Sequence, residues 1–206
     1  MNKKYLRGML LLCLCVALSA CVQHKSSPLV PTIETLQSEK VRIDITPDAP
    51  PRVYVSLRDK TDKVFGVRTL VEQRLTSMGY EITNNPSRAG YILQIDVLVV
   101  GLASGQAVRA AVPLGYGAPV DVAGTDSSVL VSDVLLALRN KPQALKKRSH
   151  VLRAVSSRSA VASYQMRVAT LSDAPTKFGE ADLRRYEEAL VTLIGDMFPA
   201  PAERKP

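Results

Sequence analysis

The clearest chemistry in the sequence belongs to Cys21, the last residue of the run Leu18–Cys21, which reads Leu-Ser-Ala-Cys. A basic start and an apolar run precede it, as in a secretory signal peptide with small residues before the cut. Cysteine after Leu-Ser-Ala is the bacterial lipobox, in which the thiol receives a diacylglycerol group, the signal is removed and the new amine is acylated. We therefore predict a signal peptide over 1–20 and lipidation at Cys21 (S-diacylglycerol cysteine, N-palmitoyl cysteine). The apolar run is shorter than the about 20 residues that span a bilayer.

The residue after Cys21 is Val22. In enterobacterial lipoproteins an aspartate at this position retains the protein in the inner membrane, so valine favours export to the outer membrane. The prediction is an outer-membrane protein held by its lipid anchor. The sequence leaves open whether it faces the cell surface or the periplasm.

Other residues with catalytic or ligand chemistry are sparse. All three cysteines lie at or before Cys21, and the two histidines, His24 and His150, have no nearby ligand set. Asp96 and Asp133 fall on expected strands, where each could be a catalytic carboxylate, but a place on an exposed face or an edge strand is favoured. The chain contains no G-x-S-x-G elbow and no phosphate-binding P-loop. We predict no enzyme activity, no metal site and no cofactor.

The chain is basic, with a formal net charge of +8. Part of the excess gathers between Lys141 and Arg158, at the expected tip of a long hairpin. A solvated tip is the favoured interpretation, and contact with anionic headgroups or a cell-wall polymer is the alternative. The envelope location argues against nucleic acid as a partner.

Periodicity divides the rest of the chain into a tether over 21–39, a single domain over 40–198 and a disordered tail over 199–206. Alternating residues predict strands, and apolar stripes at helical spacing predict a helix ending at Met78 and another over 180–197. The expected strands are 40–45, 52–59, 80–83, 91–100, 129–138 and 159–170. This order predicts an α+β fold: a mostly antiparallel sheet with two amphipathic helices on one face.

The segment 101–128 stands apart because it is rich in Gly, Ala and Val and has no charge between Ala110 and Val120. Two prolines make it too short and too broken for a spanning helix. A flexible surface loop is the favoured interpretation. The alternatives are a segment that enters a bilayer surface and one that contacts a neighbouring subunit.

Several stretches resemble the TraT family of outer-membrane lipoproteins, which act in surface exclusion during conjugal transfer and in complement resistance. The resemblance covers about 33–98 and 128–198, and its individual motifs are moderately specific. The stretches that carry it are Arg52–Lys63, Leu70–Glu72, Met78–Ile82, Tyr91–Leu98, Val131–Val134, Ser163–Val168 and the final helix. The family has a much longer Gly/Ala-rich segment where this chain has 101–128, so this chain is a divergent member.

The resemblance implies a non-catalytic homo-oligomer that blocks entry of a redundant conjugative plasmid and contacts conjugation machinery. A weaker similarity, to YajG-like outer-membrane lipoproteins, leaves an alternative open. In that alternative the chain is a structural envelope component of a secretion or cell-wall assembly.

Overall fold

The computed structural model describes residues 32–43, 51–64, 66–139, 160–175 and 179–198. Contacts divide the chain into residues 1–30 and residues 31–206, and all the described residues lie in the second unit. Its strands are β1 (Glu34–Gln37), β2 (Arg52–Asp59), β3 (Glu81–Ile82), β4 (Tyr91–Ala103), β5 (Ser127–Arg139) and β6 (Ala160–Ser172). Its α-helices are α2 (Val67–Ser77), α3 (Gly105–Ala111) and α4 (Glu180–Gly195).

The six strands form one sheet in the order β1-β6-β5-β4-β2-β3. The three long strands β4, β5 and β6 pair antiparallel, and so do β1 and β6, whereas β2 runs parallel to both β4 and β3. A connection through α2 makes the parallel β2–β4 pair possible, because parallel neighbours need a crossover. The predicted α+β class is confirmed.

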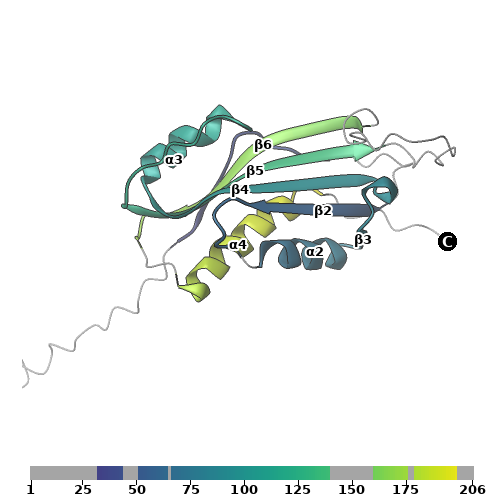
Figure 1. The fold of residues 1–206 in the computed structure, drawn as a ribbon, viewed down its shortest axis with the longest axis horizontal. Helices are drawn as coiled ribbons and strands as arrows, with labels where there is room; N and C mark the ends of the chain where they lie inside the picture. The colour runs from purple at the N-terminus through teal and green to yellow at the C-terminus, as the bar shows by residue number, and fades with distance from the viewer. Residues whose placement is uncertain (1–31, 44–50, 65, 140–159, 176–178, 199–206) are drawn as a thin grey trace, which may run out of the picture. The chain divides into compact units, whose positions relative to one another are not determined.

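Helices α2 and α4 lie together on one face of the sheet, below it in Figure 1. Val67, Val71 and Leu75 of α2 are buried there, as the stripe predicts. The end of this core holds three rings in edge-to-face contact, those of Tyr80, Tyr91 and Phe198. Burial of these apolar side chains between helices and sheet is the main stabilising contribution of this layer.

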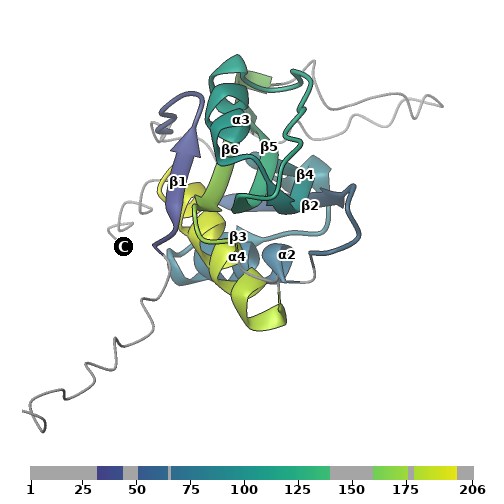
Figure 2. The same cartoon turned by 90° about the vertical axis from the view of Figure 1, so that its left-hand side faces the viewer.

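Helix α3 lies on the opposite face (Figures 1 and 2). Its buried residues Val108 and Ala111 pack with Val129 and Val131 of β5 and with Leu171 of β6. The prediction of a flexible loop over 101–128 is therefore wrong for 105–114, which form α3 and a following 3₁₀ turn (Val112–Leu114). The helix begins where the Ser104 hydroxyl accepts a bond from the backbone N–H of Ala107, an ordinary N-cap.

Two strand predictions need correction. Residues 41–43 are not a strand: Val41 and Ile43 are buried beneath the sheet, and the Ile43 N–H donates to the Met197 carbonyl at 3.0 Å. The first strand is instead β1, so part of the expected tether over 21–39 belongs to the sheet. The alternation at 40–45 therefore arises because Val41 and Ile43 are buried in a segment that is not a strand.

The second correction concerns β4. Its register with β5 shifts between Val97 and Val99, so a bulge at Leu98 turns the remaining strand over. Val100 thereby joins the α2–α4 core, while Val99 packs on the α3 side. The other strand and helix predictions are confirmed to within a few residues, including the antiparallel β5–β6 pair.

Candidate functional site

A row of four charged residues crosses the sheet on the α3 face. Arg58 of β2 is in register with Asp96 of β4, Asp96 with Asp133 of β5, and Asp133 with Arg167 of β6. Residues directly opposite each other on neighbouring strands share a face and lie within contact distance. The sheet thus assembles an Arg-Asp-Asp-Arg row from four separate parts of the sequence.

The inner half of the row is a buried ion pair. The Arg167 guanidinium donates to both carboxylate oxygens of Asp133, at 2.8 Å from Nε and 3.1 Å from Nη2. The Arg167 side chain is 0% exposed and that of Asp133 is 7% exposed. Two parallel bonds of this kind fix the geometry of both partners, and burial makes the loss of either partner costly.

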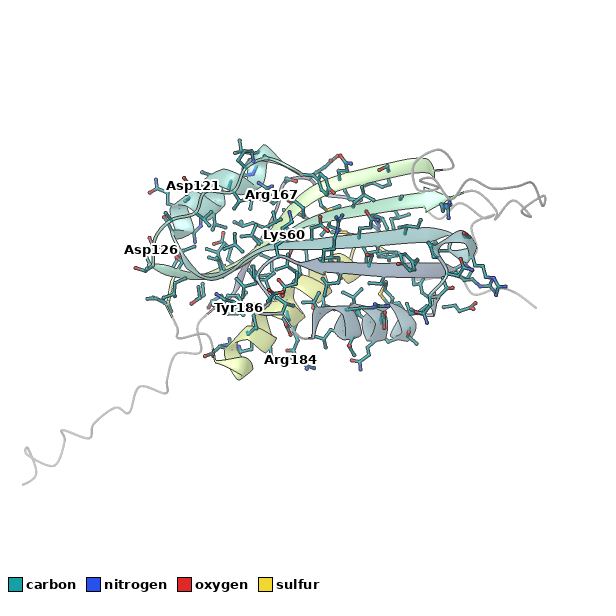
Figure 3. The ribbon with its side chains drawn as sticks, viewed as in Figure 1. Lys60, Asp121, Asp126, Arg167, Arg184 and Tyr186 are labelled. Carbon is teal, nitrogen blue, oxygen red and sulfur yellow. The ribbon has the colours of Figure 1, made fainter. Side chains whose placement is uncertain are left out.

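This buried pair also holds the segment that follows α3. Arg167 donates to the carbonyl of Ala111 at 3.3 Å and to that of Ala118 at 2.7 Å. In return, Asp133 accepts the backbone N–H of Gly117 at 2.8 Å. Figure 3 shows Arg167 between the sheet and the α3 segment. The buried guanidinium thus pairs with two backbone carbonyls of this segment, and the buried carboxylate pairs with one of its backbone N–H groups.

The outer half of the row is exposed to solvent at one end. Arg58 Nε donates to Asp96 at 3.0 Å, with side chains 67% and 14% exposed respectively. Burial raises the pKa of the nearby Tyr116 hydroxyl, and the negative charges of Asp96 and Asp133 raise it further, while Arg58 acts in the opposite direction. The tyrosine therefore stays protonated beside the two carboxylates at neutral pH.

A second ionic cluster fastens α3 at its other side. Arg109 donates to Glu34 of β1 at 2.7 Å and to Asp173, just after β6, at 3.0 Å. At the start of the helix, Asp126 accepts the backbone N–H of Gly105 at 2.9 Å. These exposed contacts tie α3 to the edge strand and to the loop that precedes β5.

These arrangements fit a structural clamp. Asp133 is neither at an edge nor on an exposed face, as the sequence had favoured; it lies on a central strand and is fully engaged by Arg167 and Gly117. Asp96 is engaged by Arg58. In the part of the chain that the structure describes, no group of three His, Cys, Asp or Glu residues could hold a metal ion.

Other predicted site residues cannot be placed. Cys21, His24, His150 and the basic stretch 141–158 lie outside the described residues. Within the described residues, no helix combines the length and apolar character needed to cross a bilayer. The most exposed large apolar side chain there is Leu114, 66% exposed, in the 3₁₀ turn after α3.

Sequence reasoning missed Arg167, although one signal was present. On its face of β6 it is followed by Ala169 and Leu171, and on β5 Asp133 follows Val129 and Val131. Opposite charges next to these apolar neighbours, on two strands expected to pair, indicate a buried ion pair.

Comparisons with known proteins give one family. The model of the family described as "Enterobacterial TraT complement resistance protein" matches residues 32–141, which run from before β1 to just after β5. No curated protein matches the sequence.

Several solved structures are similar at low identity. A PelC variant dodecamer from Paraburkholderia phytofirmans has 12% identity over 80% of this chain and 98% of that chain, with a TM-score of 0.39. A minor lipoprotein from Acinetobacter baumannii has 15% identity over 72% and 90% of the two chains, and a TM-score of 0.37. A DUF4136 family protein from Bacteroides thetaiotaomicron has 10% identity over 81% and 93%, and a TM-score of 0.37.

The similarity to these structures is too low to support a functional argument. The family match is different, because it spans more than half of the sequence and includes five of the six described strands, β1 to β5. The chain belongs to the TraT family.

Proposed function

We propose that this chain is a non-catalytic outer-membrane lipoprotein that hinders the entry of a conjugating plasmid into a cell that already carries one. The family match over residues 32–141 is the observation that carries the proposal. Lipid on Cys21 anchors the protein, and the chain acts as a homo-oligomer by contact with components of the mating apparatus. Complement resistance, which the family description names, is a second property of the same surface.

The described side chains support a role in contact rather than turnover. A general acid or base must be free to exchange a proton with a substrate. Asp133 is enclosed by Arg167 and by the backbone of Gly117, so its carboxylate has no free approach. Asp96, the more accessible carboxylate, bonds to Arg58. Both carboxylates therefore stabilise the fold through ion pairs.

The anchor follows from the lipobox. An acyl chain contributes about 0.8 kcal/mol for each buried CH₂, and one chain alone binds a membrane only marginally. Three chains on Cys21 hold the protein firmly. Radioactive palmitate should label the wild-type protein in the outer-membrane fraction and should not label Cys21→Ser.

The proposed role is tested by mating. A plasmid-free recipient that expresses the protein should receive the cognate plasmid less often than a recipient with an empty vector. A recipient that expresses Cys21→Ser at the same level is the matched control and should show no exclusion. Transfer that is unchanged by the anchored wild-type protein would falsify the proposal.

Protease treatment of intact cells decides the remaining alternative. Exclusion at the surface requires part of the protein to be accessible, so the wild-type protein should be cleaved. Full protection together with unchanged transfer would favour the structural envelope role. Serum survival of the same two strains tests complement resistance separately.

A further inference from the structure

The outer edge of β1 has backbone groups that face away from the sheet. The Ser38 N–H donates to the Arg167 carbonyl at 2.9 Å, and residues of an antiparallel pair alternate between inward and outward bonding. Glu34 and Leu36 therefore bond to β6, whereas the N–H and C=O groups of Thr35 and Gln37 point outward. β1 is the last strand on this side of the described sheet.

A groove lies beside this edge, between β1 and α4. Its volume is about 500 Å³, and its lining includes Thr35, Gln37, Lys40, Ala189, Leu193 and Met197. The floor is apolar, since Met197 is buried and Leu193 is half-buried. The side chains of Thr35 and Gln37 face the groove while their backbone groups face outward, so one incoming strand could use both.

The dimensions suit a short extended peptide. The helix side of the groove, from Ala189 to Met197, is about 12 Å long at 1.5 Å per residue. The four residues of β1 span about 13 Å. A peptide strand of about four residues, with two side chains turned towards α4, fits this length. Pairing with an exposed sheet edge while alternate side chains enter a flanking groove is a known mode of peptide recognition.

The charge of Lys40 at the groove favours a peptide with an acidic residue. Lys40 is exposed at the rim of the groove. Asp196 also lines the groove and is 70% exposed, but it lies 3.9 Å from Arg74, which partly compensates its charge. Lys40 is therefore the rim charge available to an incoming carboxylate. The edge strand Glu34–Gln37 contains no lysine or proline, and its one charged side chain, Glu34, is held by Arg109.

We propose that the groove between β1 and α4 binds an extended segment of a partner protein as an added strand. The backbone of the segment pairs with Thr35 and Gln37, its alternate apolar side chains enter the groove, and a carboxylate meets Lys40. This inference does not rest on the proposed role in surface exclusion, because it uses only the edge and the groove.

The probe is a display library of extended peptides in which valine, leucine or isoleucine occupies alternate positions and the intervening positions are random. The library is selected on the full-length protein purified in detergent. Peptides enriched on the wild-type protein should carry an acidic residue at a fixed position. They should bind Ala189→Arg roughly tenfold more weakly, because the new side chain occupies the groove. Gln73→Arg, which adds the same charge on the exposed side of α2, is the matched control and should bind normally.

Two further measurements test the binding mode. N-methylation of alternate backbone nitrogens in the selected peptide should abolish binding, because it removes the bonds to β1 without altering the protein. Lys40→Glu should weaken binding of the acidic peptide about fivefold and should strengthen binding of a peptide in which lysine replaces the acidic residue. Amide exchange should be fast at Thr35 and Gln37 in the free protein and slow with peptide, while Leu36 stays protected in both.

Three outcomes would overturn the inference. The first is a library that yields no peptide enriched on wild type over Ala189→Arg. The second is a selected peptide that tolerates backbone methylation. The third is protection of Thr35 and Gln37 in the free protein that disappears on dilution, because the occupant would then be a second copy of this chain.

Discussion

Removal of the Asp133 carboxylate is the sharpest test of the clamp beneath the α3 segment. In Asp133→Ala the Arg167 guanidinium stays fully buried but loses its only carboxylate partner among the described residues. Gly117 loses its acceptor at the same time. An unpaired buried charge of this kind costs about 3–5 kcal/mol. For a chain of this size each kcal/mol lowers Tm by about 2–4 °C, so the expected decrease is about 6–20 °C.

Asp96→Ala is the matched control, because Asp96 is the cross-strand neighbour of Asp133 in the same row. Its partner Arg58 is 67% exposed and regains water when the pair is broken. The expected loss is therefore about 0.2–1 kcal/mol. Urea unfolding monitored by circular dichroism gives the free energy of unfolding of both variants.

A double variant separates the ion pair from simple loss of contacts. In Asp133→Leu with Arg167→Met both charges are gone, so the penalty for an unpaired charge disappears. The carbonyls of Ala111 and Ala118 lose their donor, at about 1 kcal/mol each, and Gly117 loses its acceptor just as it does in Asp133→Ala. The double variant should therefore be more stable than Asp133→Ala. The reasoning fails if Asp133→Ala destabilises the protein no more than Asp96→Ala. It also fails if the destabilisation of the double variant equals the sum of those of Asp133→Leu alone and Arg167→Met alone.

Three further predictions concern single side chains. Ser132→Ala should raise the free energy of unfolding by about 1 kcal/mol, since the Ser132 hydroxyl is buried without a hydrogen-bond partner among the described residues. Ser128→Ala is the control, because it removes a hydrogen-bonded hydroxyl on the same strand and should lower the free energy of unfolding. Burial acts to raise the pKa of Asp59, but hydrogen bonds from the turn that follows outweigh this and hold it below its ordinary 3.8. Its stabilising contribution is thus present above about pH 4 and lost as pH falls through the lowered pKa, and acid titration of Asp59→Asn should lack this loss. Burial, with a smaller effect of Tyr91, raises the pKa of Tyr80 to about 12. Its contribution is therefore complete below about pH 10 and lost as pH rises through 12, so phenolate absorbance of Tyr80→Phe should lack the transition near pH 12.

The sequence was sufficient for elements whose pattern is local. The stripe Val67, Val71 and Leu75 predicts both α2 and its buried side, because helical spacing alone brings these residues together. Gly79 marks the end of that helix and has a φ of 93°, a conformation that glycine adopts without strain. The α2–α4 layer could therefore be predicted before any contact between distant residues was known.

Elements that depend on distant partners were out of reach. The bulge at Leu98 changes which face Val99 and Val100 occupy, and it is fixed by pairing with β5 rather than by the residues of β4. The strand at Glu34–Gln37 is short and lacks clear alternation in polarity. It forms because β6 offers it an edge, and a pattern search over its own residues cannot detect that edge.

The α3 segment shows the same limit at the candidate site. Its charge-free stretch between Ala110 and Val120 resembles a loop in the sequence. No side chain within the stretch indicates a hydrogen-bond partner for the backbone of Gly117 or Ala118. Both groups find their partners on the sheet, in Asp133 of β5 and Arg167 of β6, which lie 16 and 49 residues further along the chain. A buried ion pair that satisfies backbone groups costs less than it would alone, since each hydrogen bond offsets part of the desolvation of the charges. The clamp and the segment therefore stabilise each other: the pair supplies partners for the backbone of Gly117 and Ala118, and the segment supplies part of the hydrogen bonds that the buried pair needs.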